Sequence, residues 1–228
     1  MTMWCTKLCR VIVFYVLGIF IYAQESSPQF LESQLVVSHK FSDIYNANIG
    51  LSSRIEYLEK DRSFPTVFIQ LSHFSSFRIG NHSRIGLGAL YRYANDFEDH
   101  HPNEFRLTQQ LYTATKPFVI RYTHRFRLEE RFIGSELFSR IRYRMGIDFP
   151  LNGEALDVKE AYTLFNAETL LQLHKNFSPR IDVRLSGGLG ILTTPKLKLQ
   201  TILQYRFEQL TQHHNGKWFL LFGGYIKI

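Results

Sequence analysis

The chain has 228 residues, of which 45% are hydrophobic and 15% aromatic, and a formal net charge of +7. This length and composition suffice for one or two domains with a buried core, and they exclude an intrinsically disordered chain. Twenty phenylalanines, twelve tyrosines and fourteen glycines favour strands and turns, so we expect an all-β protein.

The N-terminus has the layout of a secretory signal peptide. Lys7 and Arg10 precede an uninterrupted apolar run over residues 11–21, and Ala23 precedes a polar stretch. The apolar run is too short to cross a bilayer as a helix, which disfavours the alternative of a retained membrane anchor.

We therefore predict a cleaved signal peptide at 1–23, a short N-terminal segment at 24–29 and a single barrel domain at 30–228. Both cysteines, Cys5 and Cys9, would leave with the signal peptide, so no disulfide, thiol nucleophile or cysteine metal site is predicted. The mature chain keeps a positive charge, which suits anionic partners.

From Phe30 onward, apolar residues recur at every second position and turn-forming stretches interrupt the pattern. This period of two predicts half-buried strands joined by hairpins. Eleven runs carry the pattern, at 31–41, 47–57, 67–77, 85–93, 105–111, 118–132, 141–149, 159–173, 181–191, 197–207 and 218–228.

Two architectures fit such strands: a soluble barrel or sandwich with an apolar interior, and an outer-membrane barrel with an apolar exterior. Most runs match the length of a tilted membrane-spanning strand, and they outnumber the roughly eight strands of a small soluble barrel. Aromatic residues at strand ends are typical of an interfacial girdle. The girdle candidates are Tyr57, Phe77, Tyr93, Phe132, Phe149 and Phe207.

The polar faces of the central strands are rich in arginine. Inside a barrel these charges would need paired acids, and the same register also carries glutamates and aspartates. We predict an all-β, antiparallel, up-and-down transmembrane barrel of about 10–12 strands with a charged lumen. The predicted lumen network consists of Glu104, Arg106, Arg121, Arg125, Arg127, Glu129, Arg131, Arg140, Arg142, Arg144, Glu168, Asp182, Arg184, Arg206 and Glu208. Arg127→Leu should therefore destabilise the fold more than Lys40→Leu, which lies near a turn.

Long and short connections orient this barrel. The stretches SDIY, RIGNH, ATKP and TTPK are predicted to be periplasmic turns, and EKDRSFP, ANDFEDHHPN and QLTQHHNG external loops. With eleven strands and a periplasmic C-terminus, the first strand would start outside. This leaves two alternatives: a further strand, or an N-terminus that threads the lumen.

Three central blocks also resemble a known family. EFRLTQQL (104–111), HRFRLEERF (124–132) and SRIRYRMGIDFPL (139–151) look like the domain-of-unknown-function 2490 family of secreted, β-rich proteins of Bacteroidota. The resemblance extends from about residue 30 to the end and implies an outer-membrane barrel. It implies no activity, ligand or catalytic residue. One departure is the terminal Ile228, because outer-membrane barrels usually end in an aromatic residue.

Few residues point to chemistry. The stretch SGGLG (186–190) lies inside a predicted strand and is read as a close-packed segment rather than a ligand loop. His124 falls mid-strand on the apolar register, where we expect it either to contact a neighbouring strand or to be turned inward by a bulge. A lipid-facing hydrolase, the alternative, would pair it with Ser72 or Ser139. Two loop pairs are predicted to be solvated, with a rim metal or acid–base site as the alternative: His100 and His101, and His213 and His214.

The predicted function is an outer-membrane barrel that is structural or forms a narrow pore for small, anionic solutes. The alternatives are an outer-membrane enzyme acting on lipid or at the rim, and a soluble periplasmic lipid binder with the faces reversed. The predicted partners are outer-membrane lipid, lipopolysaccharide and the barrel-assembly machinery, with a monomer favoured. Nucleic acid is not a predicted partner, because secretion and the acids Glu129 and Asp148 among the arginines argue against it. No cofactor is predicted, because the usual cofactor and catalytic motifs are absent.

Overall fold

The computed structural model describes residues 29–58, 62–94, 97, 102–210 and 215–228. The predicted signal peptide and the loop histidines His100, His101, His213 and His214 lie outside these ranges. Within them the chain forms eleven strands, and no helix there is long and apolar enough to cross a membrane. The strands are β1 (Gln29–Lys40), β2 (Tyr45–Tyr57), β3 (Thr66–Arg78), β4 (Ser83–Tyr93), β5 (Glu104–Thr115), β6 (Arg121–Ile133), β7 (Glu136–Pro150), β8 (Ala161–Leu173), β9 (Arg180–Thr194), β10 (Leu197–Glu208) and β11 (Asn215–Lys227).

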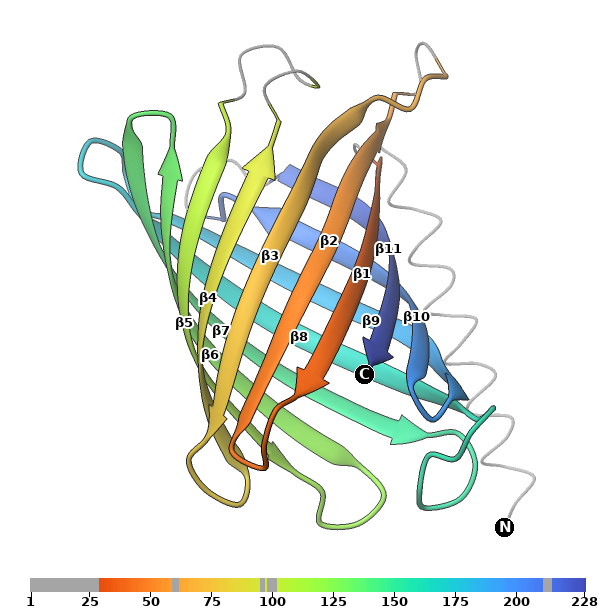
Figure 1. Ribbon diagram of the computed structural model, residues 1–228. Helices are drawn as coiled ribbons and strands as arrows, with labels where there is room; N and C mark the ends of the chain where they lie inside the picture. Colours follow the sequence, from red (N-terminus) through yellow and green to blue (C-terminus); the bar gives the residue numbers. More distant parts are fainter. Residues whose placement is uncertain (1–28, 59–61, 95–96, 98–101, 211–214) are drawn as a thin grey trace.

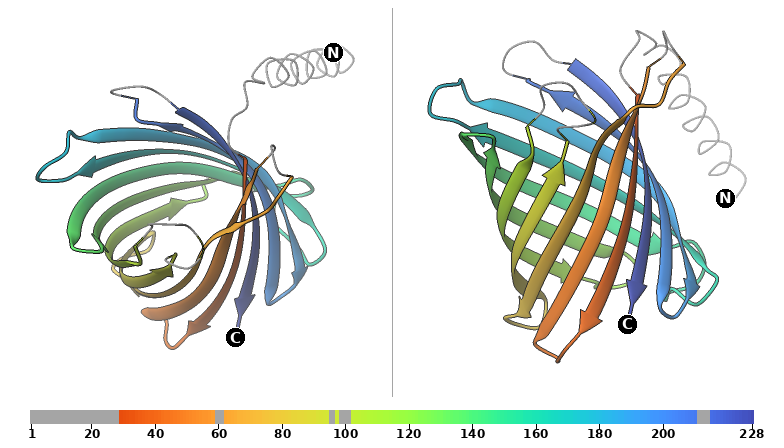
Figure 2. Two further views of the ribbon diagram at one scale, coloured as in Figure 1. Left: turned by 90° about the horizontal axis from the view of Figure 1, so that it is seen from above. Right: turned by 45° about the horizontal axis from the view of Figure 1, so that its top comes forward.

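The eleven strands close into one barrel, which confirms the all-β barrel predicted from the alternating pattern (Figure 1). Seen from above, the strands curve around a central space (left view of Figure 2), and their pairing closes the ring. Two predicted starts are wrong: residues 118 and 159 lie in the connections before β6 and β8, where Phe118 is 87% exposed and Lys159 has φ 70°. Pro117 cannot donate to a ladder, so β5 ends at Thr115 and the chain turns before β6 begins at Arg121.

The barrel closes through a parallel pair. All sequence neighbours pair antiparallel, whereas β1 pairs with β11 in parallel, from Gln29 opposite Trp218 to Ser38 opposite Lys227. With an odd number of strands, the first and last run in the same direction, so this pairing is the one that closes the ring. Neither predicted alternative, a further strand or an N-terminus in the lumen, is needed to account for the described strands.

An aromatic stack supports this seam from inside. Phe30 of β1 and Phe219 of β11 stand opposite each other, with ring centroids 4.7 Å apart and an interplanar angle of 14°. Phe219 is only 1% exposed. Such stacked pairs contribute about 0.5–1.5 kcal/mol beyond their buried area. The stack therefore helps to hold two strands that no hairpin joins.

The two ends of the barrel differ. We call the end that carries the β1–β2, β3–β4, β5–β6, β7–β8 and β9–β10 connections the turn end, and the opposite end the loop end. The connections predicted as periplasmic turns lie at the turn end, and those predicted as external loops lie at the loop end. Short and long connections, however, do not alternate strictly between the two ends. The β6–β7 connection at the loop end is a tight turn with Gly134 at φ 57°, whereas residues 151–160 form a longer connection at the turn end.

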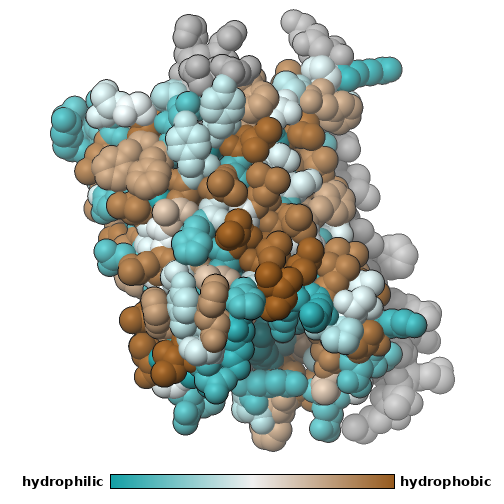
Figure 3. Space-filling model, viewed as in Figure 1, coloured by the Kyte–Doolittle hydropathy of each residue, from teal (hydrophilic) through white to brown (hydrophobic). Residues whose placement is uncertain are grey.

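Apolar side chains cover the outside of the barrel, and polar ones fill its inside. Outward residues such as Ile49 and Leu87 are 57% and 60% exposed, whereas the inward Arg142 and Glu129 are 7% and 1% exposed. On the face seen in Figure 3, apolar side chains spread over the strands and hydrophilic ones surround a hollow near the turn end. The soluble lipid binder considered above would need apolar side chains inside the barrel and polar ones outside. The structure has the opposite arrangement.

The glycines of SGGLG permit close packing, as the sequence analysis predicts. A Cβ on Gly188 would lie 2.4 Å from the backbone oxygen of Thr201 on the neighbouring β10, and backbone cannot move aside as a flexible side chain can. We expect Gly188→Ala to destabilise the barrel by about 1–3 kcal/mol, the usual cost of overpacking. Urea unfolding measures the effect, with Gly80→Ala as control because no atom lies within 4 Å of its added methyl. Equal stability of the two variants would contradict the close packing.

Candidate functional site

Three glutamates are the most deeply buried carboxylates in the barrel. Glu104 on β5, Glu129 on β6 and Glu168 on β8 are 2%, 1% and 2% exposed. Buried carboxylates are tolerated only when cations and hydrogen bonds replace their hydration. Glu104 meets this need with Arg106 at 2.6 Å, Arg131 at 2.7 Å and Arg92 at 3.3 Å.

Arg142 of β7 connects the other two glutamates. Its Nη1 donates to Glu129 at 2.7 Å and its Nη2 to Glu168 at 2.8 Å. Glu129 also has Arg127 at 3.5 Å and Arg106 at 3.7 Å. Because Arg106 contacts Glu104 as well, one continuous ion-pair network runs across β5, β6, β7 and β8.

Glu168 has more cations around it than it can neutralise. Arg125, Arg142, Arg144 and Arg184 lie 2.7, 2.8, 3.3 and 4.0 Å from its carboxylate. Four guanidinium groups thus share one negative charge. This part of the interior has an excess of positive charge.

The strand register explains why so many arginines meet. Residues directly opposite one another on neighbouring strands form a row that spirals through the tilted barrel from the turn end to the loop end. Like charges in such a row repel unless acids intervene. From β3 to β11 the row reads Arg78, Arg84, Tyr112, Arg125, Arg144, Glu168, Arg184, Arg206 and Lys217.

This row borders a cavity of about 1020 Å³ inside the barrel. Of the residues that the structure describes, fifteen arginines but only four carboxylates line the cavity. Its lining runs from residues 80–83 at the turn end to Arg180 and Glu208 at the loop end, so the cavity follows the length of the barrel. The described wall of this space is therefore strongly cationic.

Several guanidinium groups retain unused donors. The Nε atoms of Arg125, Arg140, Arg142, Arg144 and Arg184 are buried and have no hydrogen-bond partner in the protein. Arg127 donates Nε and Nη2 to the neutral side-chain oxygen of Gln110, at 3.1 and 2.7 Å. Because the unpaired Nε atoms are shielded from the open space, only other atoms of the arginines can reach a solute in the cavity.

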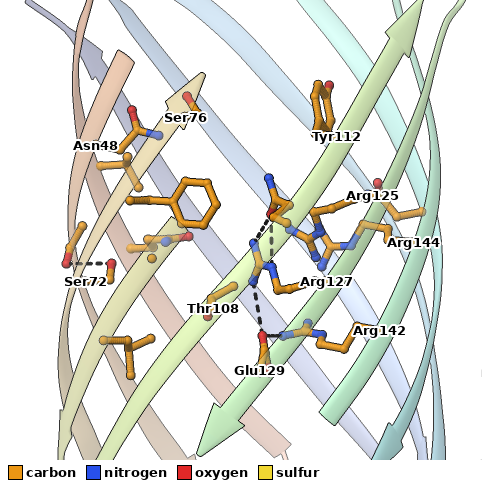
Figure 4. Close-up of a pocket in the computed structure, with 18 of the residues that line it drawn as sticks. Asn48, Ser72, Ser76, Thr108, Tyr112, Arg125, Arg127, Glu129, Arg142 and Arg144 are labelled. Atoms are coloured by element: carbon orange, nitrogen blue, oxygen red, sulfur yellow. Dashed lines mark hydrogen bonds and ion pairs between the residues drawn. The ribbon is translucent and has the colours of Figure 1, made fainter. Parts of the chain in front are cut away.

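The part of the wall that faces Arg125 and Arg144 carries uncharged polar side chains. Figure 4 shows Asn48, Ser72 and Ser76 of β2 and β3 across the cavity from Arg125 and Arg144. Asn46 donates to Asn48 at 3.2 Å, and Ser76 donates to the backbone oxygen of Asn46 at 3.3 Å. At the level of Arg125 and Arg144, the cavity therefore has arginines on one side and amides and hydroxyls on the other, whereas Arg54 and Arg78 of β2 and β3 line it elsewhere.

A family model described as "Protein of unknown function (DUF2490)" matches residues 33–217. The chain belongs to this family. No curated protein and no solved structure matches it significantly. The match covers most of the described strands, and the predicted resemblance to this family is confirmed.

All fifteen residues predicted for the lumen network of this DUF2490 barrel lie on its interior face. Thirteen of them line the cavity, and Glu104 and Glu168 are buried beneath the arginines. At the turn end Arg121 pairs with Asp148 at 2.9 Å, and near the loop end Arg180 contacts Asp182 and Glu208 at 2.8 and 3.2 Å.

A second cluster, which was not predicted from the sequence, lies at the β1–β11 seam of the DUF2490 barrel. Glu32 accepts from Arg54 at 2.9 Å and from Arg206 at 3.4 Å, and Arg206 stacks 3.4 Å from the centroid of Phe219. Arg54 also lies 4.7 Å from the ring centroid of Phe68. Glu32 and Arg54 fall on the polar register of their strands, so extending the predicted lumen face to β1 and β2 would have found them.

Within the described ranges, the candidate enzymatic residues of the DUF2490 chain do not come together. His124 lies on the outer face with Nδ1 2.8 Å from the Tyr143 hydroxyl of the neighbouring β7, as predicted for a histidine in contact with an adjacent strand. Ser72 lines the interior, and Ser139 donates to Glu130 at 2.8 Å, so neither is a partner of His124. Among the described residues no group of three or more histidines, cysteines or acids is placed to hold a metal ion.

Proposed function

We propose that the chain is an outer-membrane barrel, inserted after removal of its signal peptide, and that its cavity is a narrow passage for small anions. The observation that carries the proposal is the cationic row from Arg78 to Lys217 beside a cavity that follows the barrel. Arginine-rich linings attract anions and repel cations electrostatically.

The outer surface supports insertion into lipid. Strands of 11 to 15 residues are long enough for a tilted span, which needs about 9–11. The predicted girdle residues lie near strand ends, and Phe77, Tyr93 and Phe132 are 37%, 37% and 41% exposed on the outside. Glu130 is an outward charge near the loop end, where Ser139 and the membrane surface would satisfy it.

The polar interior supports a water-filled passage rather than a lipid site. Its lining combines guanidinium, amide and hydroxyl groups, which hydrated anions contact without losing all their water. The ion pairs around Glu104 and Glu129 narrow the loop-end half, because they place bulky, nearly buried side chains inside the ring. We therefore expect a small conductance rather than that of a general porin.

The test is a reversal potential in a planar bilayer. The purified mature protein, reconstituted in a KCl gradient, should give small current steps and a reversal potential of the sign set by chloride permeation. The double variant Arg125→Gln/Arg144→Gln should shift that potential towards zero, whereas Lys116→Gln at the turn-end surface should not. Absence of current steps, or selectivity for potassium, would overturn the proposed passage.

A further inference from the structure

The turn-end half of the cavity combines three kinds of surface that no ion passage needs together. One is the pair of arginines Arg125 and Arg144, the second is the amide and hydroxyl wall of β2 and β3, and the third is an aromatic ring. The side chains of Arg125 and Arg144 are 17% and 30% exposed, so both guanidinium groups reach the open space.

The arginine pair suits a group with several anionic oxygens. Arg125 and Arg144 stand directly opposite each other on β6 and β7, and Glu168 is their shared carboxylate. Their Nε atoms are shielded from the open space, so the exposed parts of the two side chains must make the contacts. Planar guanidinium groups bind phosphate and carboxylate through paired N–H···O bonds, so two adjacent, partly exposed guanidinium groups favour a phosphate.

Phe74 forms an aromatic platform held by two glycines. A Cβ on either Gly86 or Gly88 of the neighbouring β4 would lie 2.4 Å from the Phe74 ring, so the ring lies flat against the strand where side chains are absent. The Phe74 ring lines the cavity, and the Arg127 guanidinium is 5.9 Å from its centroid. An aromatic face of this kind packs against the apolar C–H face of a sugar ring.

The remaining wall suits hydroxyl groups. Asn46, Asn48, Ser72 and Ser76 line the same space and carry both donors and acceptors but no charge. The cavity volume of about 1020 Å³ is at the upper end of the roughly 300–1,000 Å³ usual for small-ligand sites, so a sugar-sized molecule fits with water around it.

We infer that this half of the cavity binds a sugar monophosphate, with the phosphate on Arg125 and Arg144, the ring on Phe74 and the hydroxyls on the asparagine and serine wall. The inference rests on the proposed function only in requiring an anion to reach the cavity. It goes further, because a simple passage would bind inorganic phosphate as well as its sugar ester.

Isothermal titration calorimetry of the full mature chain in detergent tests the inference, with glucose 6-phosphate, inorganic phosphate and glucose as probes. We expect glucose 6-phosphate to bind at least about tenfold more tightly than phosphate, a gain of about 1.4 kcal/mol, and glucose to bind most weakly. Equal affinities for glucose 6-phosphate and phosphate would overturn the inference, and so would no binding of glucose 6-phosphate.

Variants separate the parts of the site. Arg144→Gln should weaken both phosphorylated probes about tenfold, whereas Phe74→Leu should weaken glucose 6-phosphate more than phosphate. Lys116→Gln is the control: Lys116 donates to the backbone oxygen of Glu154 at the turn end and does not line the cavity. Heat-modifiable gel mobility shows whether each variant is folded. If a folded Phe74→Leu variant binds glucose 6-phosphate as tightly as the wild type does, the Phe74 ring does not contact the sugar and this part of the inference is wrong.

The two proposals fail in different ways. Anion-selective conductance with equal binding of phosphate and glucose 6-phosphate leaves the passage intact and removes the sugar site. Tight binding of glucose 6-phosphate without conductance removes the passage and leaves the sugar site.

Discussion

Glu168→Gln should destabilise the barrel by about 3–5 kcal/mol, because it removes the one negative charge that four guanidinium groups share. Glutamine keeps the shape and the hydrogen-bond acceptor, so the loss reports the charge rather than a cavity. Urea unfolding of the mature protein in detergent, followed through Trp218, measures the change.

Asp43→Asn is the matched control for Glu168→Gln. Asp43 pairs with Lys40 in the β1–β2 turn, and its side chain is 85% exposed, so solvent screens the pair. The midpoint of unfolding of Asp43→Asn should lie at the same urea concentration as that of the wild-type protein. A Glu168→Gln protein that unfolds together with this control would show that the interior arginines need no buried counter-charge.

Arg142→Leu should have a comparable effect, again about 3–5 kcal/mol, because it breaks the bridge between two buried carboxylates at once. Arg127→Leu should cost less, about 1–3 kcal/mol, since it removes hydrogen bonds to Gln110 while Glu129 keeps Arg142. Lys40→Leu should have no measurable effect. The same urea titration ranks the three variants.

The order in which the three variants lose stability tests the role of Arg142. From the sequence, Arg127→Leu was expected to destabilise the fold more than Lys40→Leu. The structure adds that Arg142, and not Arg127, lies at the centre of the network, so its substitution should cost the most. Should Arg127→Leu prove the most damaging, the assignment of Arg142 as the connecting residue is wrong.

The strands and their faces were predictable because a period of two is a local property of the sequence. Tyr122, Phe126 and Leu128 alternate with Arg121, Arg125 and Arg127, and the structure places the first set outside and the second inside. The alternation alone fits an apolar inside as well as an apolar outside. The apolar outside was chosen from the length and number of the strands, the aromatic residues at their ends, and the acids that share the register of the arginines.

The closure of the barrel was not predictable from local pattern. The pairing of β1 with β11 joins residues nearly two hundred positions apart, and no hairpin signal marks it. The Glu32, Arg54 and Arg206 cluster depends on that pairing, which brings β1 and β2 beside β10 and β11. The spiral of arginines likewise appears only when the register of each strand pair is known.

Phe74 shows a further limit of sequence reasoning. Its position among polar interior residues of β3 marks it as an exception to the alternation, but Gly86 and Gly88 on the next strand decide how its ring lies. Reading the role of this ring therefore requires the β3–β4 register, in which Phe74 stands opposite Gly88.

Spin labels at adjacent positions of β3 give the most direct measurement of which face lies in lipid. The mature chain is predicted to contain no cysteine, so Leu71→Cys and Ser72→Cys place single labels on the outer face, where Leu71 is 56% exposed, and in the cavity lining. In liposomes, label 71 should collide mainly with oxygen dissolved in the bilayer, and label 72 with a water-soluble nickel chelate. The reverse pattern, or equal access of the nickel chelate to both labels, would contradict a membrane barrel with a polar interior.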